Sequence, residues 1–259
     1  MNLRAGPLVF ARFAYPPNAL GYCGPADPAA LLEATAEGID LGTVSALAAR
    51  FDGAWPYLEL IAAYNGLKDP LDARVVDAYW IGNTLLNRVP TSALVAHLDS
   101  RFERRARRDF APVAEAAILG GVAHHSFHVF AVYPWLGLLR AGMDGAPLTV
   151  LDQCRVRWGR VLSVDGDTVT VRDRGLTLDG HLLVEGAQRE AFVRRSVDGV
   201  GFAQELLPGD NVALHWDWVC QKLSKGALWR LQAWTRRMLD VVNALSTPGP
   251  AVACDTRGS

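Results

Sequence analysis

Three histidines, His124, His125 and His128, form the densest group of chemically versatile side chains in the sequence. On a helix, His124 and His128 would share a face, as two ligands of one metal ion do. On a strand the same two would share a face, and His125 would point away. A metal ion would need a third ligand from elsewhere in the chain. The first candidates for it are Cys23, Asp27 and Glu59. A buried, hydrogen-bonded histidine cluster is the alternative interpretation.

The cysteines are the second group of interest, and they stand at wide spacings: Cys23, Cys154, Cys220 and Cys254. No C-x-x-C pair occurs, which excludes a zinc knuckle and a thioredoxin-type redox motif. Glycines and prolines surround Cys23 and predict a tight, irregular loop over residues 18–27. Such a loop could present a reactive or ligating thiol, or could simply plug the top of a helix bundle.

The familiar enzyme signatures are absent from the sequence. There is no Walker loop, G-x-G-x-x-G, G-x-S-x-G or H-E-x-x-H motif, so no nucleotide cofactor is expected. An enzyme of specialised metabolism would then act on a small molecule in a cleft between two domains. Its acid, base or nucleophile would come from a set of polar side chains: Cys23, Asp27, Glu59, His124, His128 and Asp217.

Two segments that differ in predicted secondary structure must position these residues. Residues 1–145 predict a mostly helical domain, in which Asp27-Pro28 and Asp69-Pro70 each place a capping carboxylate before a proline. Short β-rich runs follow. Turn signals at Asp165-Gly166-Asp167 and Asp179-Gly180 predict two hairpins. The fold class is therefore α+β.

The second domain is expected to span residues 146–245. Its five or six short strands suggest a small barrel of the OB type, because closure removes exposed strand edges. An apolar stripe from Leu228 to Val242 predicts a final helix over residues 225–244. The remaining residues, 246–259, are expected to form a loose tail.

The second domain carries the most specific motifs. Residues 154–161 read CRVRWGRV, and residues 207–215 read LPGDNVALH before a terminal helix. This pattern resembles the HypC/HupF-type chaperones of nickel–iron hydrogenase maturation. These are small OB-like barrels with an early cysteine, a Gly-x-Val strand and a Gly-Asp-x-Val-x-x-His strand. The chain departs from that pattern in three places: Cys154 is internal, Trp158 replaces a proline, and the hairpin at Asp179-Gly180 is additional.

The resemblance implies a function. In that family the cysteine and the histidine hold an iron centre that bears cyanide and carbon monoxide, and it is delivered to the hydrogenase large subunit. Carried over, the iron ligands are Cys154 and His215, and Asp217 is the expected hydrogen-bond partner of the histidine. A thiolate and an imidazole suit low-valent iron. As alternatives, Cys154 could be a small buried apolar residue and His215 a hydrogen-bonded core histidine.

The first domain is similar to an uncharacterised actinobacterial family that is associated with hydrogenases. The strings that carry this similarity are FARFAYPPNALGYCGP at residues 10–25 and FDGAWPYLEL at residues 51–60. Together the two resemblances predict an accessory protein with a maturation scaffold or a hydrogenase large subunit as its partner. Such a protein would form a hetero-oligomer.

Composition excludes several other classes of function. Lys plus Arg is 26 and Asp plus Glu is 27, which gives a net charge of -1 and no general attraction to nucleic acid or anionic membrane. The longest apolar runs fall short of the roughly 20 residues that a membrane span needs. The first residues lack the pattern of a signal peptide, so we expect a cytoplasmic protein.

Overall fold

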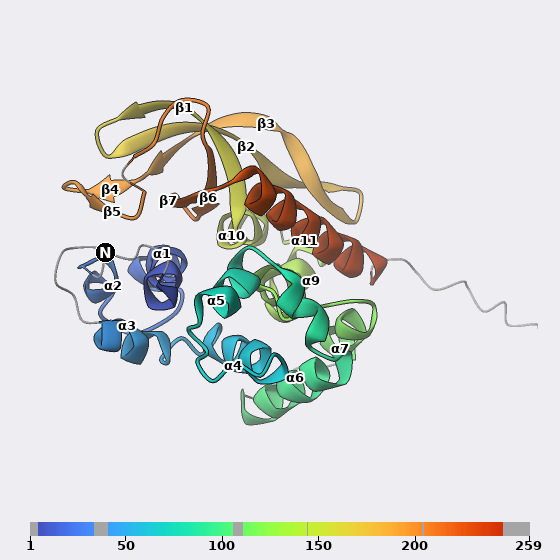
Figure 1. Cartoon of the computed structure of the whole chain (residues 1–259). Helices are drawn as coiled ribbons and strands as arrows, with labels where there is room; N and C mark the ends of the chain where they lie inside the picture. Colours follow the sequence, from blue (N-terminus) through green and yellow to red (C-terminus); the bar gives the residue numbers. More distant parts are fainter. Residues whose placement is uncertain (1–4, 34–40, 106–110, 144, 204, 246–259) are drawn as a thin grey trace, which may run out of the picture.

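A computed structural model describes the chain except for residues 1–4, 34–40, 106–110, 144, 204 and 246–259 (Figure 1). The predicted loose tail, with Cys254, lies outside the described residues. The fold class is α+β, as predicted: helices make up the first part of the chain, and strands followed by one long helix make up the second. Among the described residues, no helix combines the length and the apolar character that a membrane span requires.

The described residues as far as residue 154 form helices, most of them short, and their connections. The helices are α1 (Gly6–Ala19), α2 (Ala29–Glu33), α3 (Leu41–Ala48), α4 (Trp55–Tyr64), α5 (Ala73–Trp80), the 3₁₀ helix η1 (Thr84–Arg88), α6 (Thr91–Arg105), α7 (Ala111–Ile118), α8 (His125–Phe127), the π-helix η2 (His128–Val132), α9 (Trp135–Arg140) and α10 (Ala146–Cys154). Asp72, not Asp69, caps α5 by accepting a hydrogen bond from the Arg74 amide. Asp69 accepts from the Leu71 amide in the preceding turn.

Five strands of the described chain form a closed barrel in the order β1-β2-β3-β7-β6. They are β1 (Arg157–Asp165), β2 (Thr168–Asp179), β3 (Leu182–Arg194), β6 (Asn211–His215) and β7 (Trp218–Lys222). Closure rests on the antiparallel pairing of β1 with β6 and on one parallel pair, Arg194 with Trp218. The short strands β4 (Ser196–Val197) and β5 (Val200–Gly201) pair separately with each other.

Both predicted hairpins occur, but their strands are longer than predicted. The segment after Gly166 and the segment before Asp179 belong to one strand, β2, which pairs along β3. The register shifts between Arg174 and Leu176, on either side of Gly175. An irregularity of this kind lets a strand bend and continue past the barrel, where two separate strands were expected.

The final helix, α11 (Lys225–Ala244), has the predicted bounds. It begins where the Ser224 hydroxyl accepts a hydrogen bond from the Ala227 amide. In Figure 1 it lies between the barrel and the helices, and it contacts α8, η2 and β3. Its apolar stripe, including Leu231, Met238 and Val242, is buried there.

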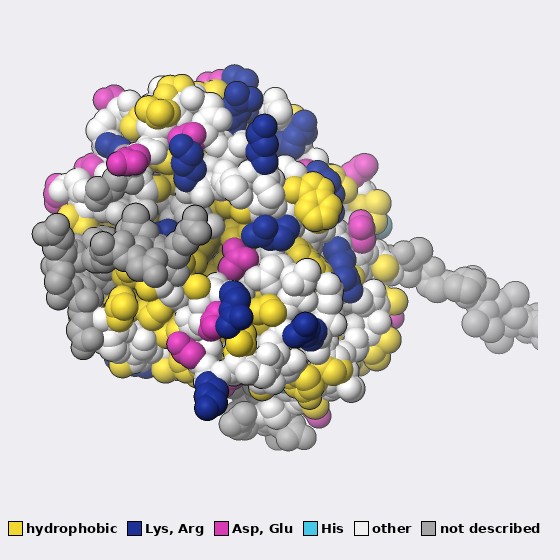
Figure 2. Space-filling model, viewed as in Figure 1, with side chains coloured by type: hydrophobic (Ala, Val, Ile, Leu, Met, Phe, Trp, Pro, Cys, Tyr) yellow, Lys and Arg dark blue, Asp and Glu magenta, His cyan; other side chains and the backbone are white. Residues whose placement is uncertain are grey.

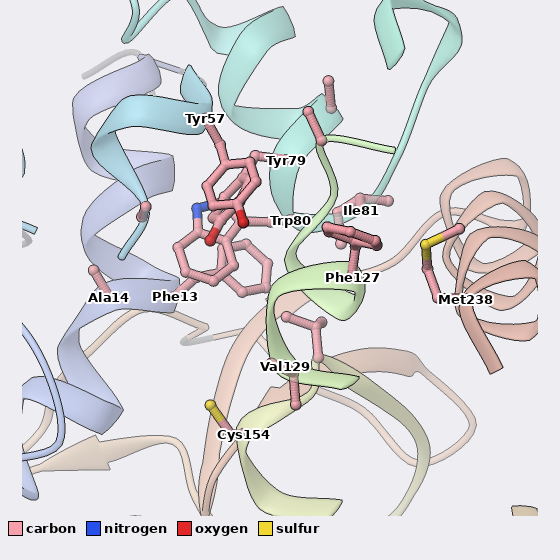
Figure 3. Packing of buried hydrophobic residues seen from close by; sticks show 14 of the residues in the cluster. Phe13, Ala14, Tyr57, Tyr79, Trp80, Ile81, Phe127, Val129, Cys154 and Met238 are labelled. Atoms are coloured by element: carbon pink, nitrogen blue, oxygen red, sulfur yellow. The ribbon is translucent and has the colours of Figure 1, made fainter. Parts of the chain in front are cut away.

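One hydrophobic cluster joins the helical part to the barrel. It contains Phe13 from α1, Trp80 from α5, and Trp216 and Trp218 from the β6–β7 hairpin. Figure 3 shows the aromatic part of this cluster, with Cys154 at the end of its helix below it. A smaller cluster of valines and leucines fills the barrel itself. The main core therefore lies between the two predicted domains, and any site there draws on both.

A largely buried network of ion pairs, with Arg189 at its partly exposed edge, fixes the junction between α10 and the barrel. Asp173 accepts hydrogen bonds from Arg157 Nε at 2.8 Å and Arg189 Nε at 2.9 Å. Asp152 accepts from Arg189 Nη2 at 2.7 Å, and Arg155 Nη2 lies 3.3 Å from the same carboxylate. Removing one member of such a network leaves an uncompensated buried charge. The network therefore holds the residues on both sides of Cys154 in place.

On the surface, charges of both signs are mixed. Figure 2 shows Lys and Arg side chains spread over one face with Asp and Glu among them. Arg172 and Glu190 form an exposed pair on the described surface, and exposed Lys222 pairs with partly buried Asp210. No broad field of one sign covers the described part of this face, which agrees with the net charge of -1.

Candidate metal centre

His125, Cys154 and His215 meet in the interior. Each offers one ligand atom, and the three atoms all lie within 4.8 Å of one another. All three residues are buried, with exposed fractions of 5%, 7% and 0%. The chain positions are far apart: α8 supplies His125, the last residue of α10 is Cys154, and His215 ends β6. The structure thus brings together the Cys154 and His215 that the resemblance paired, and adds His125.

His215 is oriented by the backbone of α1. Its Nδ1 lies 2.6 Å from the carbonyl oxygen of Phe13. In an α-helix that carbonyl would accept from the amide four residues on, which is Pro17 and has no N–H. Because a carbonyl only accepts, Nδ1 carries the proton and donates. The other nitrogen, Nε2, keeps its lone pair and has no hydrogen-bond partner among the described residues.

A backbone carbonyl also orients His125, but here Nε2 is the ring nitrogen that donates and Nδ1 is the one that keeps its lone pair. Its Nε2 donates to the carbonyl oxygen of Cys154 at 2.8 Å. That carbonyl belongs to the last turn of α10, where helix carbonyls lack intrahelical partners. Its Nδ1 is left as an acceptor, 3.3 Å from the Tyr79 hydroxyl. Metal-binding histidines usually donate their second N–H to a carbonyl or carboxylate, and both histidines do so here.

Cys154 lies at the end of a helix, where a barrel strand was expected. The predicted second domain opens with α10, and β1 begins only at Arg157. The amide of Trp216 donates to the Gln153 carbonyl at 2.8 Å and ties the β6–β7 hairpin to this helix end. That hydrogen bond brings the thiol of Cys154 beside His215.

Burial sets the protonation states of the three groups. Desolvation lowers the pKa of His215 to about 4, against the opposing effect of the Phe13 and Cys154 carbonyls. Desolvation also lowers the pKa of His125 well below its usual value, and the neighbouring His215 lowers it further. The pKa of the Cys154 thiol is raised by burial. At neutral pH the site thus holds two neutral imidazoles and a protonated thiol, which would lose its proton to a bound metal.

The three residues line a cavity of about 310 Å³ between the helical part and the barrel. Most of its wall is aromatic or aliphatic, and includes Phe51, Tyr79, Trp80, Tyr133, Trp135 and Trp216. Tyr22, which is 53% exposed, also lines the cavity, so the cavity reaches the surface there. Three protein ligands and an adjoining cavity leave room for further ligands on a bound ion.

Among the described residues, His124 and His128 belong to no common ligand group, and both are buried and hydrogen-bonded, as in the alternative interpretation. His124 has extended backbone angles and is the N-cap of α8, where its Nδ1 accepts a hydrogen bond from the Ser126 amide at 3.1 Å. Because the helix begins only at His125, His125 and His128 are the pair on one face. Burial lowers the pKa of His124 to about 3, so it is a neutral structural residue.

Two predicted residues do lie at the cavity without joining the ligand group. His128 lines it, and its Nδ1 is 3.2 Å from the Tyr57 hydroxyl. Cys23 lines it from the loop after α1, and burial raises the pKa of its thiol to about 12. Asn18 holds that loop by donating to the Cys23 carbonyl at 2.8 Å and the Pro25 carbonyl at 2.6 Å. The loop is therefore tight, as predicted, and its thiol is protonated at neutral pH.

The three predicted carboxylates lie outside the site. Asp27 is exposed, and exposed Glu59 accepts a hydrogen bond from Trp55 on its own helix. Asp217 stands in the tight β6–β7 turn, points to solvent and pairs with Arg194 at 3.5 Å. The expected hydrogen bond from His215 to Asp217 is therefore absent, and the Phe13 carbonyl has that role.

Comparison with known proteins gives a family and no function. No curated protein and no solved structure matches the chain. One protein family matches residues 2–248, which covers the helical part and the barrel together, and its description is "Family of unknown function (DUF6390)". The chain therefore belongs to the DUF6390 family.

Proposed function

We propose that the chain is a HypC-like accessory protein of nickel–iron hydrogenase maturation, which holds iron through His125, Cys154 and His215. The observation that carries the proposal is the meeting of these three ligand atoms within 4.8 Å of one another. Cys154 and His215 are the residues that the HypC/HupF resemblance implies as iron ligands. Their meeting is what that resemblance requires.

The donor set fits iron. A thiolate with two imidazoles is a soft-to-borderline set that suits iron with strong-field co-ligands. The lone pair of His215 Nε2 is buried without a partner among the described residues, which is costly unless something occupies it. An iron ion would supply a Lewis acid that binds small ligands. The chain's residues fix the imidazole tautomers, supply the thiol proton that is released, and keep water away through the aromatic wall.

The barrel supports the same assignment. Five strands that close by pairing the first with the fourth, with one parallel contact between the third and the fifth, fit a small Greek-key barrel of the OB type. The main difference from the resembled chaperones is the helical part, which encloses the cysteine and contributes His125. In this proposal the partner is a hydrogenase large subunit or a maturation scaffold protein, and transfer proceeds through the mouth of the cavity at Tyr22.

The test is metal analysis with infrared spectroscopy on protein purified without oxygen. We expect about one iron per chain and absorption bands of bound cyanide and carbon monoxide. Cys154→Ser and His215→Gln should lose the iron, whereas Cys220→Ser should keep it, since that equally buried thiol lies outside the ligand group. Equal iron content in wild-type protein and Cys154→Ser would refute the proposed centre. Failure to co-purify with a hydrogenase large subunit, with iron retained, would refute the accessory role alone.

A second function is favoured by the position of the cavity. It lies between the helical part and the barrel, where an enzyme acting on a small molecule was expected to have its cleft. His128 and Cys23 line it as acid–base or nucleophilic candidates. Iron binding without any effect of gene deletion on hydrogenase activity would favour this enzyme over the accessory protein.

A further inference from the structure

We propose that the cavity binds a small carboxylate with an apolar body, as an exogenous ligand of the metal centre. The inference rests on the metal centre of the proposed function and goes beyond it by naming the class of molecule that binds the ion when it carries no cyanide or carbon monoxide. Three properties of the cavity point to this class: its charge balance, its hydrogen-bond donors and its apolar volume.

The charge balance favours a monoanion. Before it binds cyanide, a divalent ion held by one thiolate and two neutral imidazoles keeps a net charge of about +1. The described residues that line the cavity include no Asp, Glu, Lys or Arg that could offset it. A charged group that acts on His215, the buried guanidinium of Arg157, is also positive and is itself paired with Asp173. An uncompensated charge is costly in so apolar a place, and a bound monoanion would neutralise it.

The hydrogen-bond donors favour a ligand with acceptor atoms. Trp80 and Trp216 line the cavity with exposed fractions of 3% and 7%. The indole Nε1 of each is buried and has no hydrogen-bond partner in the described structure. An indole nitrogen can only donate. A carboxylate bound to the metal through one oxygen has a second oxygen that can accept such a bond.

The volume requires an apolar body. A cavity of about 310 Å³ is at the lower end of the range for organic ligands and is far larger than an inorganic anion needs. Beyond the metal ligands its wall is built from rings and aliphatic groups, including Phe51, Pro134, Trp135 and Val150. Such a wall stabilises a ligand through burial of apolar surface.

A route to the cavity lies beside the loop that carries Tyr22 and Cys23. The Tyr22 ring stacks on Trp216 with centroids 4.2 Å apart and is 53% exposed. Gly21 and Gly24 flank Tyr22 and Cys23 in the sequence, with φ of 74° and 90°, a conformation that glycine adopts without strain. The ring of Tyr22 therefore packs on Trp216, one of the two tryptophans proposed to donate to the carboxylate.

The experiment uses the full chain loaded with Co²⁺, whose visible spectrum reports the ligands of the ion. Benzoate should change this spectrum at saturable concentrations. Formate, which lacks the apolar body, should bind at least about tenfold more weakly. Benzyl alcohol, which has the body without the charge, should leave the spectrum unchanged. Equal responses to benzoate and benzyl alcohol, or no response to benzoate, would overturn the proposal.

Variants test the assigned donor. Trp216→Phe should weaken benzoate binding about tenfold, because a hydrogen bond to a charged acceptor is lost. Trp218→Phe is the matched control and should bind like wild type. Its indole is equally buried and equally without a partner among the described residues, but it does not line the cavity. If Trp216→Phe does not fold, benzoate binding by Trp80→Phe is measured instead. Unchanged affinity in a folded variant of either cavity tryptophan would overturn its role, and failure of wild-type protein to bind Co²⁺ would refute the metal centre itself.

Discussion

The buried histidines predict that the metal-free protein loses stability between pH 7 and pH 5. His124 and His215 have pKa values of about 3 and about 4 in the folded chain, and that of His125 lies well below its usual value. In the unfolded chain each titrates near the ordinary value of about 6.5. The unfolded state therefore binds more protons throughout this window, and stability falls as the pH falls.

The magnitude follows from these values. At pH 5 an unfolded histidine is almost fully protonated while the buried one stays neutral, which costs about 2 kcal/mol per residue relative to pH 7. Three such residues give a loss of roughly 5 to 6 kcal/mol, comparable with the whole stability of many domains. The carboxyls of Asp167 and Asp210, whose pKa values are lowered from 3.8, act only at lower pH. The window from pH 7 to pH 5 therefore isolates the histidines.

Urea unfolding of chelator-treated protein at the two pH values measures this loss. His124→Asn is the informative variant, because asparagine can still cap α8 but does not titrate. Its loss between pH 7 and pH 5 should be about 2 kcal/mol smaller than that of wild type. Equal free energies of unfolding at pH 7 and pH 5 in wild-type protein would refute the reasoning from burial.

Three further predictions concern single contacts. Asp173→Asn should lower the free energy of unfolding by about 3 kcal/mol in urea titrations, because the buried guanidinium of Arg157 and the partly exposed one of Arg189 lose their charge partner; a loss under 1 kcal/mol would contradict this. Gly82→Ala should lower the melting temperature and alter tryptophan fluorescence, since a Cβ there would lie 2.0 Å from the ring of Trp234 and φ is +92°; unchanged values of both would show that the close approach is absent. Asn18→Ala should speed the reaction of Cys23 with a thiol reagent at pH 8 several-fold, because the loop loses both amide contacts; an unchanged rate would mean that Asn18 does not restrain the loop.

The turns of the barrel could be predicted from the sequence because their chemistry is local. Gly166 and Gly180 have φ of 54° and 60°, which is the conformation that an Asp-Gly turn signal indicates. The length of β2 could not be predicted in the same way. Its continuation past Gly175 depends on pairing with β3 and on a register shift, and no short sequence motif predicts that shift.

The candidate metal centre could be predicted only in part. Cys154 and His215 followed from the resemblance, and their meeting depends on α10, which was not expected at that place. His125 was missed because its face is set by where α8 begins, and the residue that caps α8 is a histidine, which is not among the usual capping residues. Pro17 does indicate that the Phe13 carbonyl lacks its helical partner. The sequence does not show that His215, 202 residues further on, donates a hydrogen bond to it.

The dispersal of the three donor atoms has a consequence for biogenesis. His125 and Cys154 are synthesised before the strand that ends in His215, and Phe13, which orients that imidazole, leaves the ribosome earliest of all. No nascent fragment that stops short of residue 215 holds the full ligand set. Such long-range contacts form late and slowly in folding. In the proposed function, iron would therefore be taken up only after the chain is complete, and a truncated or stalled chain would not hold the ion.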